Sequence, residues 1–385
     1  MNNSKKELPI ICICGLVTGI IAVLLVLLGN PANMGFCIAC FIRDTAGALK
    51  LHSAAPVQYI RPEIIGLVLG SFILSLIRKE FRPKGGSAPL TRFVLGFFAM
   101  IGCLVFLGCP FRMILRLAAG DLNALIGLAG FVCGILAGVF FLNKGFSLGR
   151  SYKQPVTDGI AFPFIQVAAL VLLIAAPAFI AFSESGPGSK HTAVIISLIA
   201  GLLVGGMAQY TRLCMVGGIR DLILFREKKL ILGFVSIFAA ALIANICTGK
   251  FNLGLTNQYN VVAHFDILWN FLGMLLVGYC CVLLGGCPLR QLILAGEGNS
   301  DSAVTVLGLI TGAAFSHNFG LASAAASKTL NDTAAADAAG VLPDSAYNIS
   351  LGGATTAGKI AVIIGLVIVT VIAVSNTYKN AKSSS

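Results

Sequence analysis

The sequence predicts an all-α integral membrane protein with about ten transmembrane helices and four short re-entrant or broken helices. Three observations support this fold class. Of the 385 residues, 57% are hydrophobic and only 11% are charged, and the mean hydropathy is +0.93, whereas a soluble domain carries about a quarter charged residues. Many apolar runs approach the length of about 20 residues that crosses a bilayer. Two cysteine-containing motifs also occur twice in the same order, which indicates an internal duplication.

Ten apolar stretches are long enough to span the membrane. They lie near residues 8–29, 62–78, 92–107, 124–143, 160–182, 192–208, 230–248, 267–285, 302–320 and 359–376. The first resembles a signal peptide, but it is longer than a signal-peptide core of about 7–15 residues and lacks a clear cleavage site, so we expect an uncleaved helix. Four further apolar segments are too short to span and adjoin the repeated motifs, as expected of helices that line a buried cavity. They are 36–49, 110–119, 213–226 and 288–296.

The distribution of basic residues predicts the orientation in the membrane. If the N-terminus is cytoplasmic, the inward loops hold the basic groups at 78–84, 144–153 and 226–229, and the tail adds Lys379 and Lys382. The outward loops, 183–191, 249–266 and 321–358, hold few basic residues. Because cytoplasmic loops are enriched in Lys and Arg, we expect both termini in the cytoplasm. Membrane topology also accounts for the net charge of +12 better than nucleic-acid binding does.

The duplication divides the chain into five parts. Residues 1–150 form a first repeat with four spans and two short helices, 151–190 a linking transmembrane helix, and 191–320 a second repeat. An outward flexible loop, 321–358, and a final helix with its cytoplasmic tail, 359–385, complete the chain. Because a single span separates the repeats, we expect the second to be inverted. Inverted repeats around a central pore-like path are typical of secondary transporters.

The motif Gly-Cys-Pro-x-Arg occurs at 108–112 and again at 286–290, at a sequence offset of 178 (287 − 109). Proline suits the first turn of a helix, so Cys109 and Cys287 are expected at helix N-termini, where backbone N–H groups and the helix dipole attract anions. Arg112 and Arg290 lie one turn further on. A proline-capped break with a buried cysteine is the alternative, but the duplication favours a functional role. The residues of the helix breaks are Gly108, Pro110, Gly286 and Pro288.

The second motif begins at Cys37 and returns at Cys214, at a sequence offset of 177 (214 − 37). Each cysteine precedes an Arg-Asp pair by six residues. A buried arginine is costly in a membrane unless it is paired, so it indicates a functional or bracing role. Adjacent helical residues point apart, so we expect Arg43 and Asp44 to pair with different neighbours. Salt bridges that brace the short helices and contacts with a substrate both remain open. The residues concerned are Arg43, Asp44, Arg220 and Asp221.

The sequence gives little indication of metal, cofactor or nucleotide binding. Free cysteines inside apolar helices behave as small hydrophobic residues, and we interpret seven of them as packing: Cys12, Cys14, Cys103, Cys133, Cys247, Cys280 and Cys281. The Cys37-x-x-Cys40 pair is not repeated, because Gly217 stands at the matching position. The sequence therefore predicts neither a metal site nor a cofactor, and it contains no nucleotide-binding motif.

At these motifs the chain resembles the YeeE/YedE family of membrane proteins associated with sulphur-compound transport. The stretches 41–44 and 106–112 are most similar to the YedE-type branch tied to selenium metabolism. The resemblance implies a bundle of inverted repeats in the bacterial inner membrane, with a central constriction through which thiosulfate or a related ion passes along cysteine thiols. It places Cys37, Cys109 and Cys287 on this path, with Cys214 as the symmetry mate of Cys37. The family is described with three such cysteines, whereas this chain has four at equivalent places.

Two functions follow from the residues and this resemblance. The leading prediction is a transporter, not an enzyme, that imports a small sulphur- or selenium-containing anion and has membrane lipid as its surroundings. The sequence leaves open whether a cytoplasmic sulphur- or selenium-carrier protein receives the cargo. The alternative is a membrane thiol oxidoreductase or persulfide- or selenium-transfer enzyme that uses Cys37 and Cys40. A purely structural subunit would explain the hydrophobicity but not the recurrence of thiol and arginine together.

Overall fold

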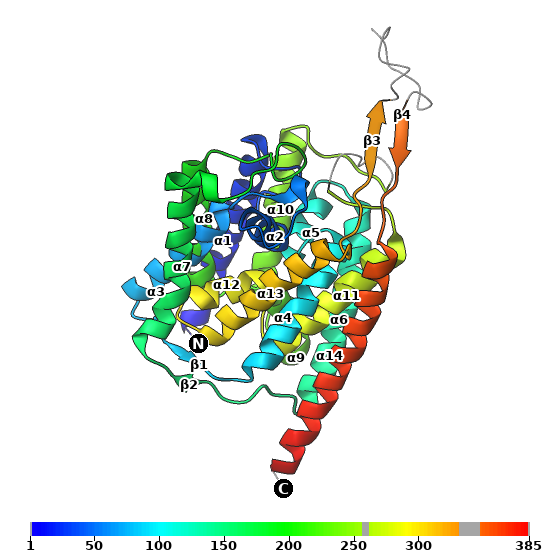
Figure 1. The fold of residues 1–385 in the computed structure, drawn as a ribbon. Coiled ribbons are helices and arrows are strands. Elements are labelled where there is room, and N and C mark those ends of the chain that lie inside the picture. The colour runs from blue at the N-terminus through cyan, green and yellow to red at the C-terminus, as the bar shows by residue number, and fades with distance from the viewer. Residues whose placement is uncertain (1, 256–261, 331–346, 384–385) are drawn as a thin grey trace.

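In the computed structural model, long helices surround four short ones (Figure 1). The structure describes residues 2–255, 262–330 and 347–383. Within these ranges, it does not describe the side chains of residues 2–6, 329–330, 347 and 379–383. The long helices are α1 (Asn2–Leu27), α3 (Pro62–Ile77), α4 (Pro89–Phe106), α6 (Leu122–Asn143), α7 (Val156–Ala175), α8 (Val194–Thr211), α10 (Lys229–Cys247), α11 (Ile267–Leu283), α13 (Ser300–Asn318) and α14 (Thr356–Ser383). The short helices are α2 (Ile38–Ala48), α5 (Pro110–Ala118), α9 (Met215–Phe225) and α12 (Pro288–Gly296).

The prediction of an all-α membrane protein is confirmed. By length and composition, nine helical segments of the described chain can cross a membrane. Helix α13 has 19 residues but is not among the nine, and its sequence includes polar residues such as Asp301 and His317. It packs against α4 within the bundle. The tenth crossing, expected at 302–320 from the apolar length of that stretch, therefore remains a prediction.

Helix α7 ends earlier than the span predicted at 160–182. The α-helix stops at Ala175, and a short 3-10 turn, Pro177–Phe179, follows. Proline disfavours the helical conformation in the residue before it, so Ala176, with φ −138°, leaves the helix. The apolar residues beyond Ala175 run across the end of the bundle instead of extending the span.

The loops divide between two ends of the bundle (Figure 1). One end, the termini end, holds both chain termini and a small antiparallel pairing of β1 (Lys84–Gly85) with β2 (Tyr152–Lys153). The other, the hairpin end, holds the antiparallel strands β3 (Ser327–Leu330) and β4 (Tyr347–Ser350). These strands lie in the segment predicted as a flexible loop, of which 331–346 is outside the described residues. The side chains of Lys379 and Lys382 are also outside them.

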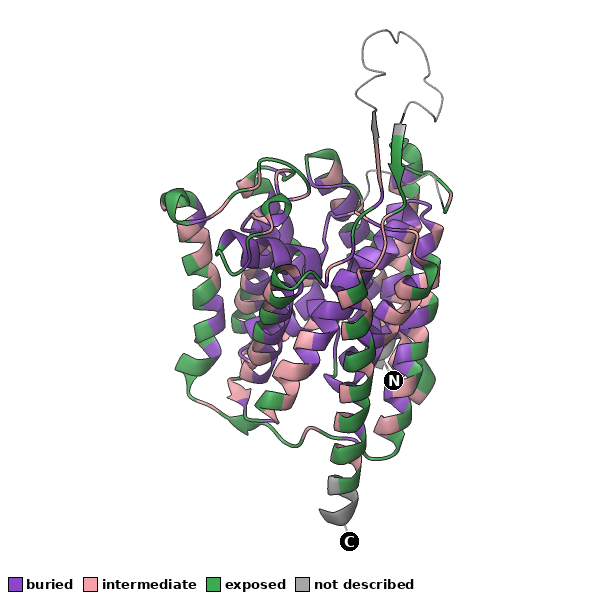
Figure 2. Ribbon diagram, turned by 45° about the vertical axis from the view of Figure 1, so that its right-hand side comes forward, coloured by how far each residue is buried: buried purple, intermediate pink, exposed green. Residues whose placement is uncertain are grey.

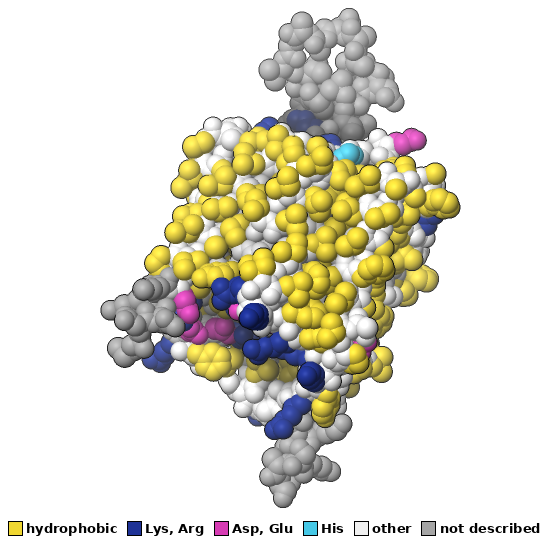
Figure 3. All heavy atoms as spheres, turned by 90° about the vertical axis from the view of Figure 1, so that its left-hand side faces the viewer, with side chains coloured by type: hydrophobic (Ala, Val, Ile, Leu, Met, Phe, Trp, Pro, Cys, Tyr) yellow, Lys and Arg dark blue, Asp and Glu magenta, His cyan; other side chains and the backbone are white. Residues whose placement is uncertain are grey.

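The surface agrees with a membrane-embedded bundle. Hydrophobic side chains cover most of the face in Figure 3, and Lys and Arg gather toward its lower end, which is the termini end. Large apolar residues are exposed on the outer helices, such as Phe164 on α7 and Ile363 on α14. The short helices α2, α5 and α12 are almost wholly buried among the long ones (Figure 2). Hence these three motif-bearing helices lie inside the bundle, whereas α9 is buried only over its first turn, from Met215 to Gly218.

The helix contacts come in matched pairs. Helix α6 packs on α11 as α4 packs on α13, and α1 packs on α10 as α3 packs on α8. In the first match, adding 178 to the numbers of α6 gives 300–321, the place of α13, and subtracting 178 from those of α11 gives 89–105, the place of α4. In the second match, the helices correspond in chain order, but their numbers do not follow one offset. Helices α4 and α11 also pack against each other. Close approach relies on small residues: a methyl group on Gly134 of α6 would overlap the carbonyl oxygen of Leu275 on α11.

Candidate functional site

The first thiol pair consists of Cys37 and Cys109. Cys37 is the N-cap of α2, and its sulphur accepts a hydrogen bond from the backbone N–H of Cys40 at 3.4 Å. Cys109 is the N-cap of α5, directly before Pro110. The two thiols lie next to each other, and both are buried. Two helix N-termini therefore converge where these sulphurs meet.

The second thiol pair, Cys214 and Cys287, repeats this arrangement. Cys214 is the N-cap of α9, and its sulphur accepts a hydrogen bond from Gly217 N–H at 3.2 Å. Cys287 is the N-cap of α12 and precedes Pro288. Their sulphur atoms lie 3.9 Å apart, and both residues are buried. The structure thus brings the four predicted cysteines together as two pairs, each within one repeat.

Glycine precedes the cysteine in both proline motifs because the arginine of the motif lies against it. A Cβ on Gly108 would be 3.2 Å from Cδ of Arg112, and one on Gly286 would be 2.9 Å from Cγ of Arg290. The left-handed residues that end the preceding helices are their neighbours, Leu107 with φ 59° and Gly285 with φ 80°. The glycines therefore make room for the arginines, and the turn itself is made one residue earlier.

Arg112 connects the two motifs of the first repeat. Its Nε donates to the carbonyl of Asn33 at 3.3 Å, in the loop before α2, and its Nη1 donates to the carbonyl of Leu107. Nη1 also approaches the Cys40 sulphur at 3.8 Å. The side chain is buried, and its Nη2 has no hydrogen-bond partner among the described residues. No carboxylate of the described chain pairs with it, so the first thiol pair lies beside an uncompensated buried cation.

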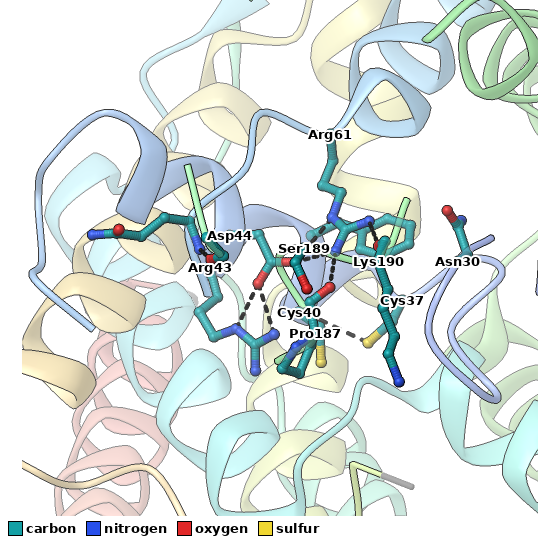
Figure 4. Close-up of polar contacts among 12 residues, drawn as sticks. Asn30, Cys37, Cys40, Arg43, Asp44, Arg61, Pro187, Ser189 and Lys190 are labelled. Carbon is teal, nitrogen blue, oxygen red and sulfur yellow. Dashed lines mark hydrogen bonds and ion pairs between the residues drawn. The ribbon is translucent and has the colours of Figure 1, made fainter. Parts of the chain in front are cut away.

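Arg43 and Asp44 pair with each other, so the expectation of different partners is wrong for this arginine. Arg43 Nη2 lies 2.7 Å from Asp44 Oδ1, because the long guanidinium side chain folds back along α2. The other carboxylate oxygen accepts a hydrogen bond from Arg61 Nε at 2.9 Å. Arg61 also donates to the carbonyls of Pro187 and Lys190 (Figure 4). Through Arg61, Asp44 thus links α2 to the loop at the hairpin end. This link agrees with the bracing interpretation.

The second repeat has different electrostatics. Arg220 pairs with Asp221 at 2.8 Å, but both side chains are partly exposed. Arg290 Nη2 lies 3.8 Å from Oε2 of Glu297, and its Nη1 has no partner among the described residues. The same Glu297 oxygen accepts from Arg212 at 2.8 Å. The arginine of the second motif therefore shares a carboxylate, in contrast to Arg112.

A cavity opens at each end of the bundle. At the hairpin end, a cavity of about 470 Å³ has a wall that includes Pro31, Pro187 and Lys190, beside the loop that leads to Cys37. At the termini end, a cavity of about 430 Å³ is lined by charged residues and includes Thr211 and Arg212, just before Cys214. The thiol pairs themselves are buried between these two cavities, so this structure is closed around them.

Sequence reasoning missed several residues near the thiol pairs. Cys103 on α4 and Cys281 on α11, interpreted above as packing, also share the repeat offset of 178 (281 − 103) and are buried on the two helices that pack together. Cys103 lies in the neighbourhood of Cys37 and Cys281, and Cys281 in that of Cys214. Their common offset is the signal that could have revealed them. Glu297 had no such signal, because Ala119 stands at its equivalent position (297 − 178).

A comparison with known families adds one finding. Residues 210–385 match the family described as sulphur transport. The matched stretch covers slightly under half of the chain, from the end of α8 to α14, and contains the second thiol pair. No curated protein matches the chain. The match agrees with the resemblance noted from the motifs and does not address the selenium branch.

Proposed function

We propose that this protein is a transporter that moves a small sulphur- or selenium-containing anion across the bacterial inner membrane along buried cysteine thiols. The observation that carries the proposal is the repeated site: two thiols at helix N-termini beside an arginine, which is buried in the first repeat and largely buried in the second. The sulphur transport match over residues 210–385 supports the substrate class.

The chemistry of the site suits a soft anion. Backbone N–H groups at helix N-termini and a guanidinium favour negative charge. Thiols are weak donors and weak acceptors, so they can hold a sulphur species without trapping it. The unpartnered Nη2 of Arg112 offers a donor beside the first thiol pair. A thiosulfate-like ion carries both the charge and the polarizable sulphur that these groups recognise.

The proposed path runs from the hairpin end to the termini end. The gathering of Lys and Arg at the termini end (Figure 3) supports a cytoplasmic assignment of that end. The matched helix contacts support two inverted repeats, and the two cavities lie beside different thiol pairs. In the proposed cycle, the anion meets Cys37 and Cys109 first and then Cys287 and Cys214.

A membrane thiol oxidoreductase that uses Cys37 and Cys40 is less well supported. Both residues are completely buried, whereas thiol–disulfide exchange requires access for the attacking thiolate. Cys37 contacts both Cys40 and Cys109, but only its pairing with Cys109 is repeated, by Cys214 with Cys287, and this repetition also favours the transporter.

Uptake into liposomes tests the proposed function. We would compare labelled thiosulfate, selenite and sulfate with the wild-type protein and with the Cys287→Ala and Cys109→Ala variants. We expect uptake of thiosulfate or selenite, but not of sulfate, and its loss in both variants. The Cys133→Ala variant is the matched control, because Cys133 is exposed on α6. Wild-type rates in Cys287→Ala and Cys109→Ala would overturn the thiol path, and background uptake of all three anions would overturn the transporter.

A further inference from the structure

The two thiol pairs differ in the charge around them. Beside the first pair, Arg43, Arg61 and Arg112 are all buried, and Arg112 pairs with no carboxylate of the described chain. Asp44 is already shared by Arg43 and Arg61. Arg116, the next buried arginine, is neutralised by Asp121 at 2.7 Å. A guanidinium buried without a counter-ion is costly, so this site gains free energy from an incoming anion.

Beside the second pair, a carboxylate is already present. Oε2 of Glu297 accepts hydrogen bonds from Arg212 at 2.8 Å and from Gln209 at 3.2 Å, and it lies 3.8 Å from Arg290. The side chain of Glu297 is only 9% exposed and that of Arg290 only 12%. Arg290 in turn interacts electrostatically with Cys214 and Cys287. The cation that would hold an anion at this pair is therefore partly neutralised by the protein.

The contact between Arg290 and Glu297 is also loose. At 3.8 Å it is an ion pair without a hydrogen bond, and Nη1 of the same guanidinium has no partner among the described residues. Glu297 is held in place from the other side by Arg212, whose second nitrogen binds Glu80 at 3.0 Å. Arg290 can therefore turn toward an anion while Glu297 stays where it is.

We propose that Glu297 competes with the transported anion for Arg290, so that the second thiol pair binds the anion more weakly than the first. The proposal rests on the transport function and deepens it. An anion that reaches Cys214 and Cys287 draws Arg290 away from the carboxylate of Glu297, which stays in place and repels the anion. Glu297 then recovers the arginine as the anion leaves toward the termini end. The affinity for the anion therefore decreases from the first thiol pair to the second, which favours release at the termini end.

A local binding assay tests this role of Glu297. Alkylation of Cys214 by N-ethylmaleimide, followed by peptide mass spectrometry, is measured with increasing sodium thiosulfate, and the half-protecting concentration is compared between proteins. Glu297→Gln removes the charge but keeps the shape and the acceptor for Arg212. We expect the half-protecting concentration to fall by about fivefold or more, the lower range of coupling between sites, and the maximal uptake rate in liposomes to fall as well.

Glu80→Gln is the matched control. Glu80 belongs to the same ion-pair network through Arg212, but no contact joins it to Arg290 among the described residues. It should leave protection of Cys214 unchanged, and Cys37 should be protected equally in all three proteins. Equal protection of Cys214 in wild type and Glu297→Gln, or an equal shift in Glu80→Gln, overturns the inference alone. If thiosulfate protects neither cysteine and uptake stays at background, the proposed function falls and this inference falls with it.

Discussion

The sulphur atoms of Cys214 and Cys287 lie 3.9 Å apart, although 73 residues separate them in the chain. Each is the N-cap of its own short helix, so the contact joins two helix N-termini. The equivalent contact between Cys37 and Cys109 forms in the first repeat. Each site therefore presents two thiols side by side, and this pairing determines how oxidation or substitution should affect the site.

The Cys214–Cys287 pair should be trapped by oxidation. Copper phenanthroline removes two hydrogen atoms from neighbouring thiols, and we expect a disulfide between these residues because their sulphurs are already in contact. Uptake should stop and return after reduction with dithiothreitol. Peptide mapping identifies the linkage, and Cys214→Ala should show no such cross-linked peptide. A cross-link confined to other cysteines would contradict the closed geometry.

Asp44 should contribute far more to stability than its repeat counterpart Asp221. Asp44→Asn leaves Arg43 and Arg61 buried without their shared carboxylate, and breaking a buried ion pair costs about 3–5 kcal/mol. Asp221→Asn breaks one partly exposed pair with Arg220, worth about 0–1 kcal/mol. Thermal unfolding in detergent compares the two variants. Equal loss in both would show that Asp44 does not brace α2.

Arg112 should be irreplaceable by lysine. Lys keeps the positive charge but cannot reach Asn33 and Leu107 together while leaving a further N–H group toward the thiols. We expect Arg112→Lys to reduce uptake by tenfold or more, about 1.4 kcal/mol, in protein that is still expressed. The initial uptake rate at saturating thiosulfate is the measurement. Wild-type uptake by the lysine variant would mean that charge alone suffices.

Cys281 should matter for uptake while its neighbour Cys280 should not. Both are buried on α11, but only Cys281 interacts with Cys214 and has an equivalent, Cys103, in the first repeat. We expect Cys281→Ala to slow uptake severalfold and Cys280→Ala to leave it unchanged, at equal protein levels. Identical rates would return Cys281 to a packing role.

Gly134 should be intolerant of a side chain. Gly134→Ala places a methyl group against the carbonyl oxygen of Leu275 and forces α6 and α11 apart, at a cost of about 1–3 kcal/mol. Gly206→Ala is the control, because the nearest atom to its Cβ is 3.9 Å away. Melting temperatures in detergent should separate the two variants. A stable Gly134→Ala protein would contradict the close packing of this helix pair.

The sequence alone determined the class of the fold and the places of its helices. Apolar length predicts transmembrane helices because unpaired backbone groups are excluded from the bilayer core, and the proline after Cys109 and Cys287 correctly places both at helix N-caps. The constant offset between the two copies of each motif identified the four motif cysteines as equivalent pairs. These properties depend on local or periodic sequence patterns, so they can be predicted from a single sequence.

The partners of those residues were decided only by the tertiary structure. No periodicity predicts that Cys37 meets Cys109, that Arg43 folds back onto Asp44, or that Arg61 shares that carboxylate. The repeated motif also does not predict that Arg112 lacks a carboxylate partner whereas Arg290 shares Glu297. Contacts between side chains that are distant in sequence depend on how the helices cross. The duplicated sequence predicts the same contacts in both repeats, but the packing gives the two repeats different ones.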